Sequence, residues 1–213
     1  MQQIIIAIVL LFSSKVMVTT NEVLLNKATM NMFIMIYAIW FFSEVILSLL
    51  LRSKNKGFKS KDNNTLKIIW LLIFIAIFLA VYATNFNFSI ANSAIINYVG
   101  LLFICIGVVL RFAVIVNLGK FFTVDVTIKD NHKLKTNGFY RYLRHPSYTA
   151  SLLSFIGFGI SLNNWISLML IIGLVLIGFL IRIKIEEKVL INYFGTEYLN
   201  YKKHTQKIIP FIY

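Results

Sequence analysis

The stretch SYTASLLSFIGFGISLNNWISLMLIIGLVLIGFLI, residues 147–181, decides the fold. It holds two apolar runs, Ser147–Leu162 and Trp165–Ile181, which are separated only by Asn163 and Asn164. A helix that crosses a bilayer needs about 17–25 apolar residues, so each run is close to the width of a membrane. A two-residue polar break between such runs is typical of a tight turn between antiparallel helices. The stretch therefore predicts a helical hairpin in a membrane.

The composition extends this prediction to the whole chain. The sequence has 213 residues, of which 59% are hydrophobic and 14% are charged. Soluble domains are about 45–50% apolar and about 25% charged, so a conventional soluble domain is excluded, as are disordered and collagen-like chains. The single cysteine, Cys105, excludes an intrachain disulfide and a cysteine-rich metal site. We predict an all-α, polytopic transmembrane protein.

Apolar runs predict about six spans. These are Ile4–Val18, Met30–Leu51, Leu66–Ala83, Ile95–Val116 and the two arms of the hairpin. The net charge of +13 comes mainly from Lys and Arg within residues 52–67, 120–144 and 182–207, which lie in alternate loops and the tail. This distribution follows the positive-inside rule and predicts that both termini are cytoplasmic. It does not resemble the single basic face of a nucleic-acid-binding protein, so we predict no nucleic-acid partner.

Three ionisable residues lie inside predicted spans, namely Lys15, Glu44 and Arg111. A charge in hydrocarbon is costly, and such residues usually pair with one another or extend to the interface. Glu44 and Arg111 both lie near the cytoplasmic ends of their spans. We expect that they either pair across helices or reach the interface separately.

Polar and aromatic residues gather in two cytoplasmic segments. The first is HKLKTNGFYRYLRHPSY, residues 132–148, and the second is IRIKIEEKVLINYFGTEYLNYKK, residues 181–203. A loop as long as residues 117–146 is usually functional when it is rich in aromatic residues. The two segments therefore predict a binding site on the cytoplasmic side.

Local physics indicates what such a site would bind. Pro146 suits the first turn of a helix, which places His145 beside free backbone N–H groups that favour an anionic ligand group. Tyr140 and Tyr148 offer flat faces for an adenine or ribose. Arg182 and Glu186 are four residues apart and share one helix face. The residues alone predict a cytoplasm-facing pocket for an anionic, aromatic-bearing ligand next to the bilayer.

Each of these features also has a purely structural interpretation. His145–Pro146 could be a simple helix cap, the tyrosines could be interfacial aromatics, and Arg182–Glu186 could be an ordinary ion pair. A metal site built on His132 and His145 is excluded by spacing and by missing partners. Gly157-Phe158-Gly159 lies inside a span, so it is not a dinucleotide-binding loop.

Taken in order, these motifs resemble the isoprenylcysteine carboxyl methyltransferase family. They are H132-x-L-x-x-x-G-x-Y-x-x-x-R-H-P-S-Y148, R182-x-x-x-E-E187, F194-G-x-E-Y-x-x-Y-K202 and I209-P-F, preceded by L110-R-F-A and L118-G119. The resemblance covers roughly residues 100–213. It implies an all-helical membrane protein with a five-span core, to which the first span adds a sixth, and a cytosolic pocket for S-adenosyl-L-methionine. We divide the chain accordingly into N-terminal transmembrane helices (1–94) and a methyltransferase core (95–213), which comprises the cofactor-binding loop, the hairpin and a C-terminal amphipathic segment.

The resemblance also implies roles for individual residues. The matching positions for the cofactor are His132, Lys133, Leu134, Lys135, Tyr140, His145, Pro146, Ser147, Tyr148 and Glu186. Arg182 matches the position that handles the carboxylate of the acceptor, and a further cofactor contact of the family falls near Asp125. No metal ligand is implied.

We therefore predict a membrane methyltransferase that moves a methyl group from S-adenosyl-L-methionine to a lipophilic acceptor. A carboxylate is already a nucleophile near neutral pH, so alignment of donor and acceptor is the main requirement. Arg182 favours the carboxylate of a prenylcysteine over a phospholipid amine, and a small thiol stays open. The alternatives from other classes are an NADPH-dependent sterol-type reductase and a non-enzymatic scaffold or channel. Abundant Ile, Asn and Lys indicate an AT-rich genome, so we expect a prokaryotic cell membrane, and we make no prediction of oligomeric state.

Overall fold

The computed structural model describes residues 27–51, 65–119 and 133–209. Apart from two isolated β-bridges, the regular structure of these stretches is helical. The elements are α2 (Lys27–Leu50), α3 (Thr65–Ala83), α4 (Ile95–Leu118), the 3-10 helix η2 (Gly138–Arg141), α5 (Pro146–Ser161), α6 (Trp165–Phe194) and α7 (Thr196–Lys203). The all-α prediction is confirmed for these residues.

Each described helix from α2 to α6 begins within three residues of a predicted span. Among the described residues, α2 from Asn31, α3, α4 and α6 are long and apolar enough to cross a membrane. The fifth, α5, has 16 residues. The predicted span Ile4–Val18, and Lys15 within it, lie outside the described residues.

The last helix is longer than the apolar pattern predicted. The apolar span was predicted to stop at Ile181, with Arg182 and Glu186 following on the same helix, and α6 continues to Phe194. The continuation contains no glycine or proline until Gly195, whose φ of 58° ends the helix in a conformation that glycine adopts readily. The charged part of the helix therefore extends rigidly beyond the apolar part.

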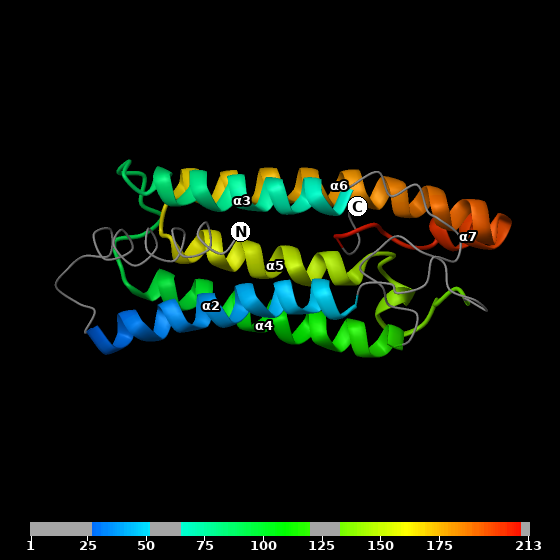
Figure 1. Cartoon of the computed structure of the whole chain (residues 1–213), viewed down its shortest axis with the longest axis horizontal. Coiled ribbons are helices and arrows are strands. Elements are labelled where there is room, and N and C mark those ends of the chain that lie inside the picture. Colours follow the sequence, from blue (N-terminus) through cyan, green and yellow to red (C-terminus); the bar gives the residue numbers. More distant parts are fainter. Residues whose placement is uncertain (1–26, 52–64, 120–132, 210–213) are drawn as a thin grey trace.

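The helices form a bundle around α5. Figure 1 shows α5 between the α3–α6 pair on one side and the α2–α4 pair on the other, with α7 at one end. The core includes Ile104 of α4, Phe155 and Phe158 of α5 and Phe179 of α6. Trp40 of α2 joins this core by stacking edge-on against Phe155, with ring centroids 5.0 Å apart.

Small residues bring the backbones of α4 and α5 into contact. A Cβ at Gly100 would lie 2.5 Å from the carbonyl oxygen of Gly157, and one at Gly107 would lie 2.7 Å from the backbone nitrogen of Ser154. No larger side chain fits at either glycine without moving a backbone. This close approach is characteristic of helix pairs in membranes, where packing replaces the hydrophobic effect as the source of association. It also gives Gly157 a packing role.

The turn between α5 and α6 confirms the predicted hairpin. Asn163 adopts a φ of 50°, and its Oδ1 accepts hydrogen bonds from the backbone N–H groups of Ile90 and Ala91. Asn164 caps α6 by accepting a hydrogen bond from the N–H of Ser167 at 3.0 Å. The two asparagines thus close the hairpin and fasten the α3–α4 connection to it.

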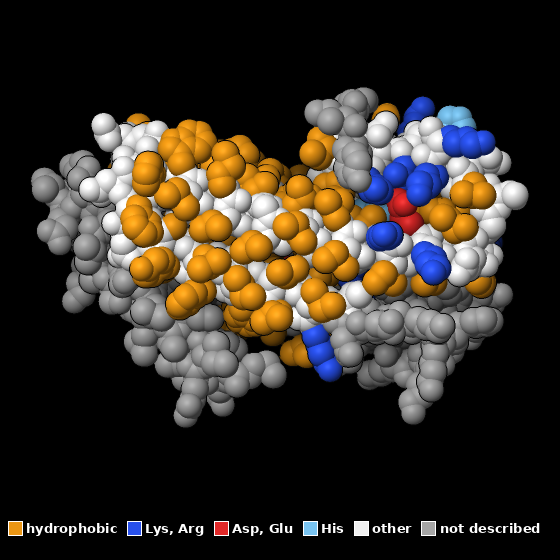
Figure 2. Space-filling model, turned by 90° about the horizontal axis from the view of Figure 1, so that it is seen from above, with side chains coloured by type: hydrophobic (Ala, Val, Ile, Leu, Met, Phe, Trp, Pro, Cys, Tyr) orange, Lys and Arg blue, Asp and Glu red, His pale blue; other side chains and the backbone are white. Residues whose placement is uncertain are grey.

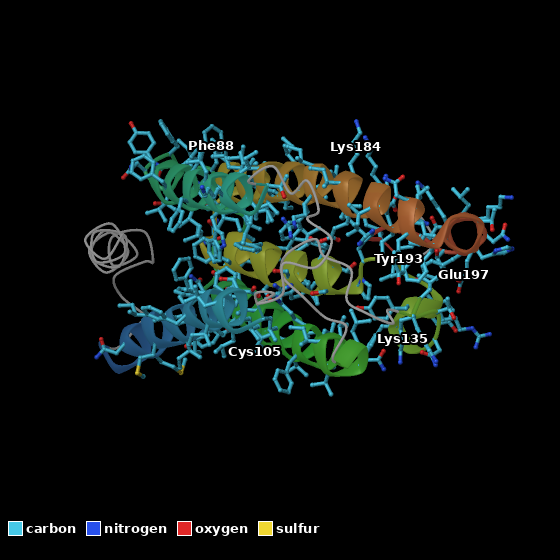
Figure 3. All side chains as sticks on the ribbon, turned by 45° about the vertical axis from the view of Figure 1, so that its right-hand side comes forward. Phe88, Cys105, Lys135, Lys184, Tyr193 and Glu197 are labelled. Carbon is cyan, nitrogen blue, oxygen red and sulfur yellow. The ribbon has the colours of Figure 1, made fainter. Side chains whose placement is uncertain are left out.

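The two ends of the bundle differ in chemistry. Figure 2 shows hydrophobic side chains spread over one part of the visible face, while Lys and Arg gather around an acidic side chain towards one end. We call this the charged end; it contains η2, α6 beyond Ile181, and α7. Figure 3 shows Lys135, Tyr193 and Glu197 at the charged end and Phe88 at the opposite end. Exposed apolar residues such as Ile39, Leu71, Val109 and Met169 cover the helices between the ends, as expected of a surface that faces lipid.

Two of the three charges predicted inside spans, Glu44 and Arg111, pair with each other. The Nε atom of Arg111 on α4 lies 2.9 Å from Oε1 of Glu44 on α2. Nη1 of Arg111 also donates to the carbonyl oxygen of Ser147 at 3.0 Å and to its hydroxyl at 2.9 Å. Of the two outcomes expected from the sequence, pairing is confirmed. The pair links α2 to the first turn of α5.

Candidate active site

Three of the predicted site residues converge on the carboxylate of a fourth, Glu186. The hydroxyl of Tyr148 donates a hydrogen bond to Oε1 at 2.6 Å. The Nε atom of Arg182 lies 3.5 Å from the same oxygen, and Nδ1 of His145 lies 3.4 Å from Oε2. Residues from the start of α5 and the end of α6 thus form one cluster at the charged end.

The local fold explains why these residues meet. Pro146 occupies the first turn of α5, as predicted, and His145 is the residue just before the helix. Tyr148 follows within that turn, while Arg182 and Glu186 lie one turn apart on α6. Since α5 and α6 are the two arms of one hairpin, the start of α5 lies beside the far part of α6. The hairpin therefore determines the site.

The neighbouring residue, Glu187, belongs to a second cluster, in which Glu187 and Arg144 are buried and Lys202 is partly exposed. Its Oε1 lies 2.9 Å from Nε of Arg144, and its Oε2 lies 2.7 Å from Nζ of Lys202. Arg144 in turn donates from Nη1 to the carbonyl oxygens of Lys202 and Thr205. This cluster fastens α7 and the residues after it to α6.

The segment after α7 runs beside the segment before α5. The N–H of Gln206 donates to the carbonyl oxygen of Tyr142 at 2.9 Å, and the N–H of Arg144 donates to the carbonyl oxygen of Gln206 at 2.8 Å. One residue further on, the N–H of His145 donates to the carbonyl oxygen of Lys207 at 3.1 Å. These bonds form a short parallel ribbon. It holds the backbone of His145 in place and orients the imidazole towards α6.

Electrostatics favour a protonated His145. Burial lowers the pKa of this imidazole, but the nearby carboxylates of Glu186 and Glu187 outweigh burial and hold the pKa above its ordinary value. His145 was expected beside an anionic ligand group. The structure instead places two carboxylates of the chain itself next to the ring.

Three tyrosines at the charged end are held in the neutral form. Burial raises the pKa of Tyr140, Tyr198 and Tyr201. The hydroxyl of Tyr201 donates to the backbone carbonyl oxygen of Tyr140 at 2.6 Å, which ties η2 to α7. Tyr201 thus acts as a hydrogen-bonding group, whereas the buried hydroxyl of Tyr198 has no hydrogen-bond partner among the described residues.

The remaining predicted site residues lie around this core. Lys133 is exposed, Leu134 and Lys135 are partly exposed, and Tyr140 is buried. Pro146 and Ser147 are buried, and the hydroxyl of Ser147 accepts a hydrogen bond from Nη1 of Arg111. His132 and Asp125 fall outside the described residues, so their predicted roles stay predictions.

Several residues of the site were not singled out from the sequence. Arg144 and Glu187 lie inside the quoted motifs. Each is a charged residue directly next to a predicted contact, Arg144 before His145 and Glu187 after Glu186, and this position could have identified them. Thr65 had no such signal, yet its hydroxyl accepts a hydrogen bond from Nη1 of Arg182 at 2.6 Å. Within the described stretches, no group of three or more His, Cys, Asp or Glu residues could hold a metal ion.

The comparisons with known proteins agree with this geometry. The sequence model of the "Isoprenylcysteine carboxyl methyltransferase (ICMT) family" matches residues 98–192. A "Probable protein-S-isoprenylcysteine O-methyltransferase" of Oryza sativa subsp. indica is 36% identical over 119 residues, which are 55% of this chain and 62% of the relative. The "Protein-S-isoprenylcysteine O-methyltransferase" of Schizosaccharomyces pombe is 34% identical over 133 residues, or 62% of this chain and 54% of the relative. The chain thus spans little more than half the length of these relatives.

A solved structure extends the similarity to the fold. It is described as the "eukaryotic intramembrane Ras methyltransferase ICMT", and it superposes with a TM-score of 0.60 at 23% sequence identity. The superposition covers 97% of this chain and 75% of that one, and it shows a shared polytopic helical fold. Residues 98–192, which carry His145, Tyr148, Arg182 and Glu186, match the isoprenylcysteine carboxyl methyltransferase family, as the sequence motifs predict.

Proposed function

We propose that the protein is a membrane methyltransferase that transfers a methyl group from S-adenosyl-L-methionine to the carboxylate of a prenylcysteine-like acceptor. The names of its relatives, protein-S-isoprenylcysteine O-methyltransferases, support the reaction class. The observation that carries the proposal is the convergence of His145, Tyr148 and Arg182 on Glu186 at the charged end.

The two neighbouring carboxylates differ in a way that fits a cationic ligand. The side chain of Glu186 is 21% exposed, whereas that of Glu187 is 6% exposed. Glu186, whose charge is partly offset by His145 and Arg182, therefore remains accessible at the edge of its cluster, and Glu187 is held by Arg144 and Lys202. A sulfonium or ammonium group next to Glu186 would interact in a medium of low dielectric, where charge attraction is strong. The residues present thus fit S-adenosyl-L-methionine.

Each residue of the cluster has a role in this proposal. Glu186 would hold the positive part of the cofactor, and Tyr148 and His145 would fix the position of that carboxylate. Leu134 and Lys135, which remain partly exposed, would line the same side. When bound, the cofactor supplies an activated methyl group on a sulfonium.

Arg182 would hold the carboxylate of the acceptor. Its guanidinium lies at the boundary between the apolar and charged parts of α6, which is the level that a lipid-anchored carboxylate reaches. An oxygen of that carboxylate would take the methyl group from the sulfonium, whose sulfur would keep the electron pair of the broken carbon–sulfur bond. The acceptor would become a neutral methyl ester, and no residue would need to remove a proton.

The test uses purified protein in lipid nanodiscs with methyl-labelled S-adenosyl-L-methionine and S-farnesyl-N-acetylcysteine. We expect label in the acceptor that is released as methanol by mild base, because a methyl ester is hydrolysed under these conditions. Label that resists base would identify a methylated amine or thioether and overturn the carboxyl assignment. The matched control is the carboxamide of the same acceptor, which we expect to remain unlabelled because it has no carboxylate.

The relation to the membrane is part of the proposal. Positive residues at the charged end, including Lys184, Lys188 and Lys203, favour a cytoplasmic location for this end, where the cofactor is available. Residues 95–213 would then form the methyltransferase core and residues 1–94 its N-terminal helices. A cysteine-accessibility experiment with the substitutions Lys188→Cys and Phe88→Cys, in a Cys105→Ser background, distinguishes the two orientations in intact cells.

A further inference from the structure

α3 and α6 pack antiparallel in one continuous register. At the hairpin end, Nδ2 of Asn164 donates to the carbonyl oxygen of Ala83 at 3.2 Å, and the hydroxyl of Ser167 donates to that of Ala80 at 2.6 Å. Moving three residues back along α3, from Ala83 to Ala80, corresponds to moving three residues forward along α6, from Asn164 to Ser167. These buried hydrogen bonds are expected to fix the register firmly, since water does not compete for them.

The same register continues to the other end of α3. A Cβ added to Gly178 would lie 3.3 Å from Cδ1 of Leu72 and 3.8 Å from Cα of Ile69, so this glycine lets α3 come close to α6. One turn further, the register brings Thr65 opposite Arg182. Thr65 is 2% exposed and Arg182 is 1% exposed, and the hydrogen bond between them measures 2.6 Å.

Two contacts then act on two different nitrogens of the Arg182 guanidinium. Nε lies 3.5 Å from Oε1 of Glu186, on the same helix, and Nη1 donates to Oγ1 of Thr65, on another helix. A planar group that is held at two separate nitrogens cannot rotate freely about its Cδ–Nε bond. The orientation of the guanidinium plane is thereby fixed, and recognition of a carboxylate by arginine depends on that orientation.

We infer that Thr65 is a positioning residue, which orients Arg182 for the carboxylate of the acceptor. This inference rests on the proposed function, because it assigns the acceptor carboxylate to Arg182. Thr65 lies on α3, outside residues 98–192. The N-terminal helices therefore contribute to acceptor recognition, while the donor is held by α5 and α6.

The experiment compares the variants Thr65→Val and Thr65→Ser. Valine keeps the shape of threonine and removes the hydroxyl, whereas serine keeps the hydroxyl and removes only a methyl group. Thr84→Val is the matched control, because Thr84 follows the opposite end of α3 and its hydroxyl bonds only to the carbonyl oxygen of Val81 among the contacts described. All variants are studied in the full chain in nanodiscs.

We expect Thr65→Val to raise the KM for S-farnesyl-N-acetylcysteine about tenfold, in line with the loss of one hydrogen bond to a charged group. The affinity for S-adenosyl-L-methionine, measured by calorimetry, should stay within about twofold, because Glu186 keeps its other partners. Thr65→Ser should restore the KM, and Thr84→Val should leave it unchanged. The inference is overturned if Thr65→Val matches the wild type, if serine fails to restore the KM, or if donor and acceptor affinity fall together.

A binding measurement separates this inference from the proposed function. Competition binding of the farnesylated acid and of its carboxamide needs no turnover. We expect Thr65→Val to weaken binding of the acid and to leave binding of the carboxamide unchanged. If the wild-type protein transfers no methyl group, but Thr65→Val weakens binding of the acid and not of the carboxamide, the proposed reaction is wrong and the role of Thr65 stands. If the wild type transfers methyl groups and the acid and carboxamide respond alike to the substitution, the role of Thr65 is wrong.

Discussion

Glu186 and Glu187 follow one another on α6, and their carboxylates face the two different nitrogens of one imidazole. Oε2 of Glu186 lies 3.4 Å from Nδ1 of His145, and Oε1 of Glu187 lies 3.6 Å from Nε2. The ring therefore separates a partly exposed carboxylate from an enclosed one. In the proposed function the first carboxylate binds the ligand, whereas the second attaches α7 through Lys202.

The substitution Glu186→Gln should weaken binding of S-adenosyl-L-methionine about tenfold to hundredfold, the range for a hydrogen-bonded charge. Glutamine has the same shape and can still accept from Tyr148, so the helix packing is expected to persist. Calorimetry measures the affinity, and the melting temperature in detergent checks the fold. Unchanged affinity in a folded variant would remove Glu186 from the binding site.

The substitution Glu187→Gln should act on stability instead. It leaves Arg144 buried without its carboxylate, and removal of one partner from a buried pair costs about 3–5 kcal/mol. Because Lys202 also loses its partner, we expect α7 to detach first. Limited proteolysis after Phe194, together with thermal unfolding, measures this effect. If Glu187→Gln melts like the wild type and resists protease, the enclosed cluster does not hold α7.

Arg182→Ala should remove about 2–4 kcal/mol of transition-state stabilisation, as for other preorganised contacts at a reacting centre. This loss should appear as a lower kcat/KM for a farnesylcysteine acid. Lysine should restore only part of the activity, since it lacks the planar fork of arginine. Donor affinity is measured in parallel, because Arg182 also contacts Glu186. If turnover is untouched, the acceptor is not a carboxylate that this residue holds.

The ion pair between Glu44 and Arg111 should couple α2 to the cofactor site. In a double-mutant cycle with Glu44→Gln and Arg111→Gln, we expect a coupling free energy of about 0.5–3 kcal/mol in thermal unfolding. Arg111→Gln should in addition weaken cofactor binding, because it releases Ser147 at the start of α5. Additive effects of the two substitutions would mean that the pair contributes nothing as a pair.

The stabilising effect of His145 should depend on pH. Its pKa is raised in the folded protein by Glu186 and Glu187, while Arg144 and Lys202 neutralise part of their charge. A raised pKa means that the folded state binds the proton more tightly than the unfolded state. The contribution is therefore complete below pH about 6.5, the ordinary pKa of histidine, and is lost as the pH rises through the higher pKa of the folded state.

Thermal unfolding of the wild type and His145→Gln between pH 5.5 and 9 measures this dependence. The difference in melting temperature between the two proteins should be largest at the acidic end and shrink as the pH increases. A difference that grows with pH would show that His145 is neutral in the folded protein.

Much of the fold followed from the sequence, because its causes are local. Apolar runs and the Asn163–Asn164 break determine the helices α2 to α6 and the hairpin, and Pro146 determines where α5 starts. The pairing of Glu44 with Arg111 was one of two expected outcomes, since a charge in hydrocarbon leaves few alternatives. The cluster of His145, Tyr148, Arg182 and Glu186 followed from the motifs.

Other contacts could not be derived in this way, because they depend on register between distant helices. Threonine is a common residue type at the start of a helix, and nothing in the sequence around Thr65 indicates that it contacts Arg182. The ribbon between Gln206 and residues 142–145 joins segments about 60 residues apart through backbone atoms, which carry no sequence signal. The helix that carries Arg182 and Glu186 was predicted, but its end was not; α6 ends at Phe194, just before Gly195.

The shortness of α5 has a consequence for where the surrounding lipid acts. Its 16 residues extend about 24 Å, against about 30 Å for the hydrocarbon core of a bilayer. Lipid does not impose this mismatch on α5, because the helix lies between the α3–α6 and α2–α4 pairs and none of its residues is exposed. The hydrophobic thickness that the bilayer meets is therefore set by the longer helices α2, α3, α4 and α6, and the length of α5 is set by its packing against protein.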